Sequence, residues 1–216
     1  MSSTIHSRLQ TVKSSIEGHE CTLVAVSKTK PNELIMEAYD AGQRDFGENK
    51  VQDLVAKAEA LPKDIRWHMI GHLQRNKVKY IVPFVHLIHG IDSEKLLKEI
   101  NKEAAKINRT VNGLLQVHIA KEDTKFGFSE EELEEFISKD GLSKYPNVKI
   151  EGLMGMATFT EDKSQVAEEF TTLKTLFDQY EWDTLSMGMS GDYQIAIEQG
   201  SNMIRVGTAI FGERNY

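Results

Sequence analysis

Short apolar segments alternate with amphipathic segments about eight times along the 216 residues of this chain. The first apolar segment, Leu23 to Val26, has no polar residue at alternate positions, which is typical of a strand covered on both faces. Alternating strands and helices predict a parallel sheet with crossover helices. Eight such units, in a chain close to the minimum length for the fold, predict an α/β protein with one (β/α)₈ barrel spanning residues 1–216.

An open doubly wound sheet is the alternative fold. It is disfavoured because Ser27-Lys28-Thr29-Lys30, which follows the first strand, is not the glycine-rich turn of a dinucleotide-binding sheet. The expected strands cover residues 22–28, 45–47, 66–71, 84–88, 114–119, 148–154, 184–187 and 203–206. Helices are expected over 4–17, 31–41 and 74–80, and from 51, 93, 129, 164 and 192, while 208–211 is expected to run out toward the C-terminus.

Composition excludes several functional classes. A net charge of −7 argues against a general nucleic-acid binder, which needs a basic face for phosphates. The sequence shows no signal peptide and no apolar run long enough for a membrane span, so no membrane association is expected. The single cysteine, Cys21, excludes an internal disulfide framework and is consistent with the cytoplasm.

Lys28 is expected at the carboxyl end of the first buried strand, where active sites of α/β proteins gather. An amine partly removed from water there can attack a carbonyl and form a Schiff base. The alternative is an ordinary solvated surface lysine.

Two later turns carry groups suited to an anion. Ser190 follows the seventh expected strand and precedes a helix, and Gly207-Thr208 follows the eighth. The loops after strands seven and eight are where barrels usually bind phosphate, through backbone N–H groups and hydroxyls. The alternative is two ordinary turns that contain a serine and a threonine.

Arg205 lies inside the eighth expected strand, between Ile204 and Val206, and its charge needs a buried partner. That partner is either a strand-end acid such as Glu48 or a ligand in the barrel mouth. A Schiff-base lysine, a phosphate site and an inward arginine together indicate pyridoxal 5′-phosphate, whose ring nitrogen takes an Asp or Arg partner.

Five motifs then carry a specific resemblance: residues 25–31 (AVSKTKP), 46–49 (FGEN), 67–77 (WHMIGHLQRNK), 185–192 (LSMGMSGD) and 204–212 (IRVGTAIFG). They resemble those of the pyridoxal phosphate homeostasis proteins, also described as proline synthase co-transcribed or alanine-racemase-N-terminal-like proteins. The resemblance implies a barrel like the N-terminal domain of alanine racemase, with Lys28 as the internal aldimine lysine. It also implies cofactor contacts by Asn49 on the hydroxyl side, Arg205 at the ring nitrogen, and Ser190, Gly207 and Thr208 at the phosphate.

The resemblance further implies a cofactor-binding protein of intracellular pyridoxal phosphate homeostasis, with no established turnover and with apo-enzymes as recipients. The alternative is a weakly active, racemase-like enzyme. Alanine racemase adds a C-terminal domain with a tyrosine base across a dimer interface, and this chain ends at Tyr216, so a monomer without the second base is expected. A cofactor-free aldolase using Lys28 is a third hypothesis. No metal site is expected, because His68 and His72 flank a strand at a spacing that separates them.

Overall fold

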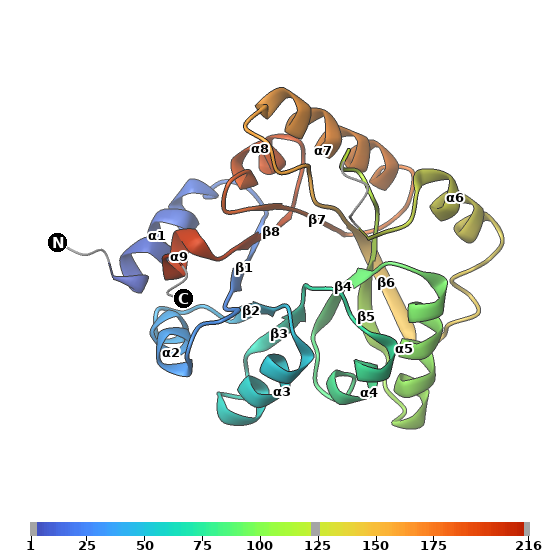
Figure 1. Ribbon diagram of the computed structural model, residues 1–216, viewed down its shortest axis with the longest axis horizontal. Coiled ribbons are helices and arrows are strands. Elements are labelled where there is room, and N and C mark those ends of the chain that lie inside the picture. Colours follow the sequence, from blue (N-terminus) through green and yellow to red (C-terminus); the bar gives the residue numbers. More distant parts are fainter. Residues whose placement is uncertain (1–3, 122–125, 214–216) are drawn as a thin grey trace.

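The computed structural model describes residues 4–121 and 126–213. Within them, eight parallel strands pair in sequence order and close into a barrel, with the helices around the outside (Figure 1). The predicted (β/α)₈ barrel is therefore confirmed. The strands are β1 (Thr22–Val26), β2 (Asp45–Glu48), β3 (Arg66–Met69), β4 (Leu87–Ile91), β5 (Val111–Gln116), β6 (Val148–Met154), β7 (Thr184–Met189) and β8 (Met203–Val206).

The helices follow the strands in turn, except that α1 precedes β1 and packs against the last helix, α9. Figure 1 shows α1 and α9 side by side on the outside of the barrel. The helical elements are α1 (Ile5–Ser15), α2 (Asn32–Asp40), α3 (Val51–Ala60), η1 (Arg75–Lys77), α4 (Val78–Ile81), α5 (Glu94–Lys106), α6 (Glu130–Ser138), α7 (Lys163–Phe177), α8 (Tyr193–Glu198) and α9 (Thr208–Phe211).

Four sequence predictions need correction. β4 begins three residues later than expected, because Phe84 and Val85 close the end of α4 through N–H bonds to the Ile81 carbonyl. β5 lies three residues earlier, and β1 ends at Val26, so that Lys28 falls in the following turn. Residues 208–211 form the helical turn α9, whose backbone bonds back to Gly207.

Alternation along β8 divides its side chains between two cores. Ile204 packs in the layer between strands and helices, whereas Met203 joins a separate cluster inside the barrel with Val24, Leu87, Leu114 and Met154. Because successive side chains of a strand point to opposite faces, Arg205 points to the same inner face as Met203.

Gly152 shows how closely β6 and β7 approach. It pairs with Thr184, and a Cβ at position 152 would lie 1.7 Å from the Thr184 carbonyl oxygen. We expect Gly152→Ala to destabilise the fold by about 3 kcal/mol, since the strands must separate to admit the methyl group. Denaturant unfolding measures this, with Gly191→Ala as the control because no described residue beyond its two chain neighbours has an atom within 4 Å of the added Cβ. Equal stabilities for the two variants would contradict the prediction.

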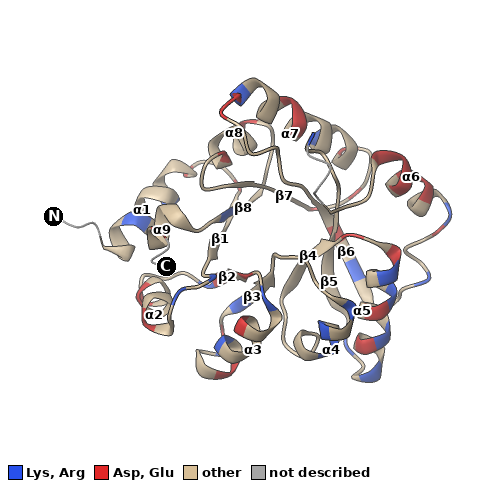
Figure 2. Cartoon of the chain, viewed as in Figure 1, with Lys and Arg blue, Asp and Glu red and all other residues tan. Residues whose placement is uncertain are grey.

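Charged residues concentrate on the helices, and Figure 2 shows a run of acidic residues on α6. That run begins with a capping box in which Ser129 and Glu132 bond each other's backbone. Across residues 4–121 and 126–213, no helix combines the length and apolarity that a bilayer crossing requires.

Candidate functional site

A cavity of about 380 Å³ lies where the carboxyl ends of β1, β2, β7 and β8 meet. All six residues that the sequence singled out line it, although they come from four segments of the chain: Lys28, Asn49, Ser190, Arg205, Gly207 and Thr208. The structure thus brings the predicted residues to one place, and their roles there remain predictions.

Lys28 sits in the turn that follows β1 and is half-buried. Thr29 adopts a left-handed conformation, with φ of 64°, and the Lys30 N–H bonds the Ser27 carbonyl to close the turn. The Lys30 ammonium, which also lines the cavity, donates to the carbonyls of Phe211, Gly212 and Glu213 at 3.3, 3.1 and 2.9 Å. Lys30 therefore ties this turn to the end of the described chain.

A buried ion pair supports the Lys28 turn from outside the barrel. The Lys57 ammonium of α3 donates to Glu48 Oε1 at 2.7 Å and to the Ser27 carbonyl at 2.9 Å. The Ser27 hydroxyl donates to the same carboxylate oxygen at 2.5 Å. Glu48 is fully buried, and its burial raises the pKa of the carboxyl although both hydrogen bonds oppose the shift.

Gly71, which follows β3, has no side chain and therefore leaves room for the backbone of Asn49. Asn49 can then reach the cavity. A Cβ at Gly71 would lie 2.5 Å from the Asn49 carbonyl oxygen and 2.8 Å from its Cα. The absence of a side chain at position 71 thus allows the segments after β2 and β3 to touch.

The two predicted anion loops are bonded to each other. The Gly207 N–H donates to Ser190 Oγ at 3.1 Å, so the serine hydroxyl spans the loops after β7 and β8. Asp192 shapes the first loop by accepting from the Met189 N–H at 2.5 Å. The helices that follow are short, so hydroxyls and loop N–H groups are the anion-binding features here.

Arg205 is 3% exposed and donates to three uncharged acceptors. Nη1 bonds the Ser186 carbonyl at 2.9 Å and the Ser186 hydroxyl at 2.5 Å, and Nη2 bonds the Gly155 carbonyl at 3.0 Å. The alternative partner considered from the sequence, Glu48, pairs with Lys57 instead. Burial lowers the pKa of the Arg205 guanidinium to about 10, with the Asp192 carboxylate opposing the shift.

The apolar wall of the cavity was not predicted from the sequence. Ile70, Met156, Met189 and Phe159 line it, and Phe159 is 98% exposed. The signal available was their position in the segments that follow β3 and β6 or at the end of β7, where barrel loops converge.

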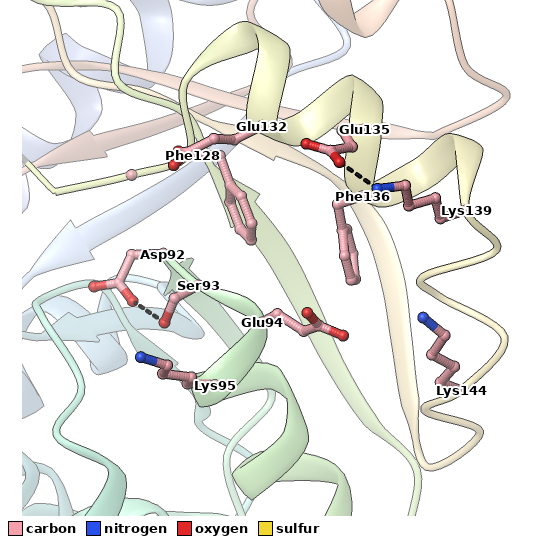
Figure 3. Close-up of a pocket in the computed structure, with 11 residues that line it drawn as sticks. Asp92, Ser93, Glu94, Lys95, Phe128, Glu132, Glu135, Phe136, Lys139 and Lys144 are labelled. Carbon is pink, nitrogen blue, oxygen red and sulfur yellow. Dashed lines mark hydrogen bonds and ion pairs between the residues drawn. The ribbon is translucent and has the colours of Figure 1, made fainter.

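A second cavity of about 580 Å³ lies between the start of α5 and α6 (Figure 3). Phe128 and Phe136 stack in it with ring centroids 5.8 Å apart, and Lys139 pairs with Glu135 beside them. None of the six predicted residues lines this cavity.

His68 and His72 do not share a site. His72 Nδ1 lies 2.9 Å from Asp92 Oδ2, and the His72 ring stacks on Phe126. His68, in contrast, is buried in the barrel. Asp45, His68 and His86 place polar atoms within 4.8 Å of one another, but the Arg66 guanidinium bonds both oxygens of Asp45, at 2.7 and 2.5 Å. That cluster is thus organised as an ion pair.

The fold and this site define a (β/α)₈ barrel protein with a lysine after its first strand, an inward arginine on its last, and a small-molecule cavity between them. The chain belongs to the alanine racemase N-terminal domain family, whose profile matches residues 2–215, and within it to the pyridoxal phosphate homeostasis proteins. Proteins of that name from Aquifex aeolicus and Vibrio alginolyticus are 42% and 43% identical over 207 and 204 residues. These alignments cover 92% and 90% of this chain and 90% and 87% of the relatives.

Solved structures agree with the assignment. PipY of Synechococcus elongatus PCC7942, solved with PLP bound, is 35% identical, with a TM-score of 0.87 over 97% of this chain and 100% of PipY. Alanine racemase from Bartonella henselae is 14% identical, with a TM-score of 0.77 over 98% of this chain and 60% of the racemase, and shows a shared fold.

Proposed function

We propose that this chain binds pyridoxal 5′-phosphate in the 380 Å³ cavity, holds it as a Schiff base on Lys28, and takes part in its intracellular homeostasis by releasing it, as a monomer, to apo-enzymes. The observation that carries the proposal is the convergence of an amine, two hydroxyls and a buried guanidinium on one cavity. The homeostasis proteins to which the chain is related and the PLP-bound PipY structure support the identity of the ligand.

The cavity fits each part of this cofactor. Its volume lies within the range of roughly 300–1,000 Å³ of small-molecule sites. Ser190, Gly207 and Thr208 would hold the phosphate, since they supply hydroxyls and loop N–H groups on the β7–β8 side. Arg205 would donate to the ring nitrogen, and Asn49 would lie beside the ring hydroxyl.

The bound cofactor supplies an aldehyde and an electron-accepting ring. Lys28 would hold the cofactor covalently, because a neutral amine at the cavity is the nucleophile that an aldehyde accepts. Arg205 would hold the ring nitrogen by hydrogen bonding without giving it a full proton, because a pKa of about 10 keeps the guanidinium charged at neutral pH. A ring left unprotonated is a weak electron sink, which favours holding the cofactor over carbanion chemistry.

Reconstitution tests the proposal. Purified protein mixed with pyridoxal 5′-phosphate and freed of excess should show a visible absorption band, and borohydride should fix one cofactor-sized mass increment on the chain. Pyridoxal without the phosphate should load far less well if the β7–β8 loops bind that group. Protein that stays colourless and unlabelled after addition of cofactor would overturn the proposal.

A weakly active, racemase-like enzyme is the alternative, and solvent exchange separates the two. Loaded protein in deuterated buffer should incorporate no more deuterium at Cα of alanine, or of a panel of other amino acids, than free cofactor at equal concentration does. Incorporation well above that background would favour the enzyme.

A further inference from the structure

A chain of hydrogen bonds crosses the barrel interior from the amino end of β2 to Arg205. His68 Nε2 lies 3.1 Å from Asp45 Oδ1, and His68 Nδ1 lies 2.9 Å from His89 Nε2. His89 Nδ1 in turn lies 2.9 Å from the Ser186 hydroxyl, which Arg205 also contacts at 2.5 Å. All five residues are buried, and they come from β2, β3, β4, β7 and β8.

The two ends of this chain fix its direction. Arg205 can only donate, so the Ser186 hydroxyl accepts from it and must place its own proton on another acceptor. Among the described residues, His89 Nδ1 is the acceptor in contact with Ser186 Oγ, so the serine hydroxyl donates to it. His89 therefore carries its own proton on Nε2 and donates that proton to His68 Nδ1. His68 then carries its proton on Nε2 and donates to the Asp45 carboxylate, which accepts.

The reverse direction is less favourable. It requires His68 to carry two protons so that His89 donates to Ser186, and the serine hydroxyl proton then has no acceptor among the contacts of the described residues. A buried unpaired hydroxyl costs about 1–3 kcal/mol. The reverse direction would also place a second buried cation, the doubly protonated His68, in the same hydrogen-bond chain as Arg205. His86, whose ring centroid lies 5.3 Å from that of His68, is a further titratable group on this side, and burial lowers its pKa.

We propose that Ser186, His89, His68 and Asp45 are positioning residues for Arg205, linked as a one-way chain of donors that ends on Asp45 at the far end of the barrel. Contacts with the described residues Ser186 and Gly155 use three of the five N–H groups of the guanidinium, and Arg205 also lines the cavity. The Asp45 carboxylate is the anion that the aligned donors face, and it is itself held by Arg66. The consequence for a ligand ring at Arg205 rests on the proposed function, whereas the direction of the chain does not.

Nitrogen-15 NMR of the histidine rings tests the direction in cofactor-free protein. Both His68 and His89 should appear as neutral rings protonated on Nε2, with ring N–H signals that exchange slowly because both residues are buried. Loss of one signal set in His68→Gln and of the other in His89→Gln assigns them. A ring protonated on Nδ1, or a doubly protonated His68 at neutral pH, would overturn the proposal whether or not the protein binds the cofactor.

Ser186→Ala tests the coupling, with Ser201→Ala as the matched control. Ser201 is another buried serine between β7 and β8. Among the described residues, its hydroxyl lies within bonding distance only of backbone carbonyls, those of Leu185, Met187 and Met203. We expect Ser186→Ala to change the His89 ring signals, to shift the absorption maximum of loaded protein, and to weaken cofactor binding about tenfold. Ser201→Ala should lower thermal stability without moving the ring signals or the spectrum.

The outcomes separate the two proposals. Unchanged ring signals in folded Ser186→Ala protein, or equal spectral shifts in both serine variants, would overturn the positioning role. If wild-type protein binds no cofactor while its rings show the expected protonation, the proposed function fails and the chain of donors stands. Asp45→Asn extends the test to the far end, where the His68 signal should shift first.

Discussion

Lys28→Ala should abolish the visible absorption band of the loaded protein and the borohydride-stable label. The band requires a C=N bond, and the substitution removes the amine that forms it. Arg205, Ser190 and Thr208 still line the cavity, so the cofactor should bind without a covalent bond and at least about a hundredfold more weakly, or about 2.7 kcal/mol. Absorption titration and mass spectrometry after reduction measure both effects.

Two variants separate nucleophilicity from charge and position. Lys28→Arg keeps a cation in the turn but offers no neutral amine, so it should lose the band as completely as alanine does. Lys30→Ala should keep the band, because the Lys30 ammonium is already bonded to three backbone carbonyls near the C-terminus. A band that survives in Lys28→Ala, with the label on another lysine, would show that the carrier amine has been misassigned.

Lys57→Met should destabilise the fold by about 4 kcal/mol, because it leaves the fully buried Glu48 carboxylate without its ionic partner. For a chain of this size, that corresponds to roughly 10 °C in melting temperature. The double variant Glu48→Gln/Lys57→Met should recover most of the loss, since no buried charge remains. Lys102→Met, which breaks an exposed ion pair with Glu99, should change stability by less than about 0.5 kcal/mol.

The Lys57→Met deficit should also depend on pH. Burial already raises the pKa of Glu48 in the folded protein, and loss of the Lys57 hydrogen bond and charge should raise it further. A carboxyl whose folded pKa exceeds its unfolded value loses stability as pH rises through the interval between them. Acidification toward the unfolded pKa of glutamate should therefore narrow the gap to wild type, and denaturant unfolding across that range measures it. A constant gap would contradict this account of Glu48.

The barrel and its site were predictable from the sequence to different extents. Repetition of strand and helix was enough for the fold, and the position of Lys28 after a buried run was enough to bring it to the cavity. The start of β4 was not predictable, because Phe84 and Val85 have the composition of a strand but close a helical turn. Local composition does not distinguish those two uses of apolar residues.

The hydrogen-bond chain from Arg205 to Asp45 inside the barrel could not be predicted from the sequence, for another reason. A lone histidine in an apolar strand, such as His89, gives no sign in the sequence of a hydrogen-bond partner. Its partners, His68 and Ser186, lie 21 and 97 positions away, and only barrel closure brings the three together. The inward position of Arg205 was predictable from alternation, but the uncharged partners it uses were not.

The cavity sits astride the junction at which β8 pairs with β1. Two of its predicted binding residues, Lys28 and Asn49, come from the first quarter of the chain, and the other four come from the last quarter. A nascent polypeptide still on the ribosome therefore has no complete site until its final strand emerges. A ligand that contacts residues on both sides of that junction would bind only the closed barrel. The melting temperature of the protein should therefore rise as the ligand concentration rises. Ligand binding would then select for correctly folded protein, since a barrel that failed to close could not bind the ligand.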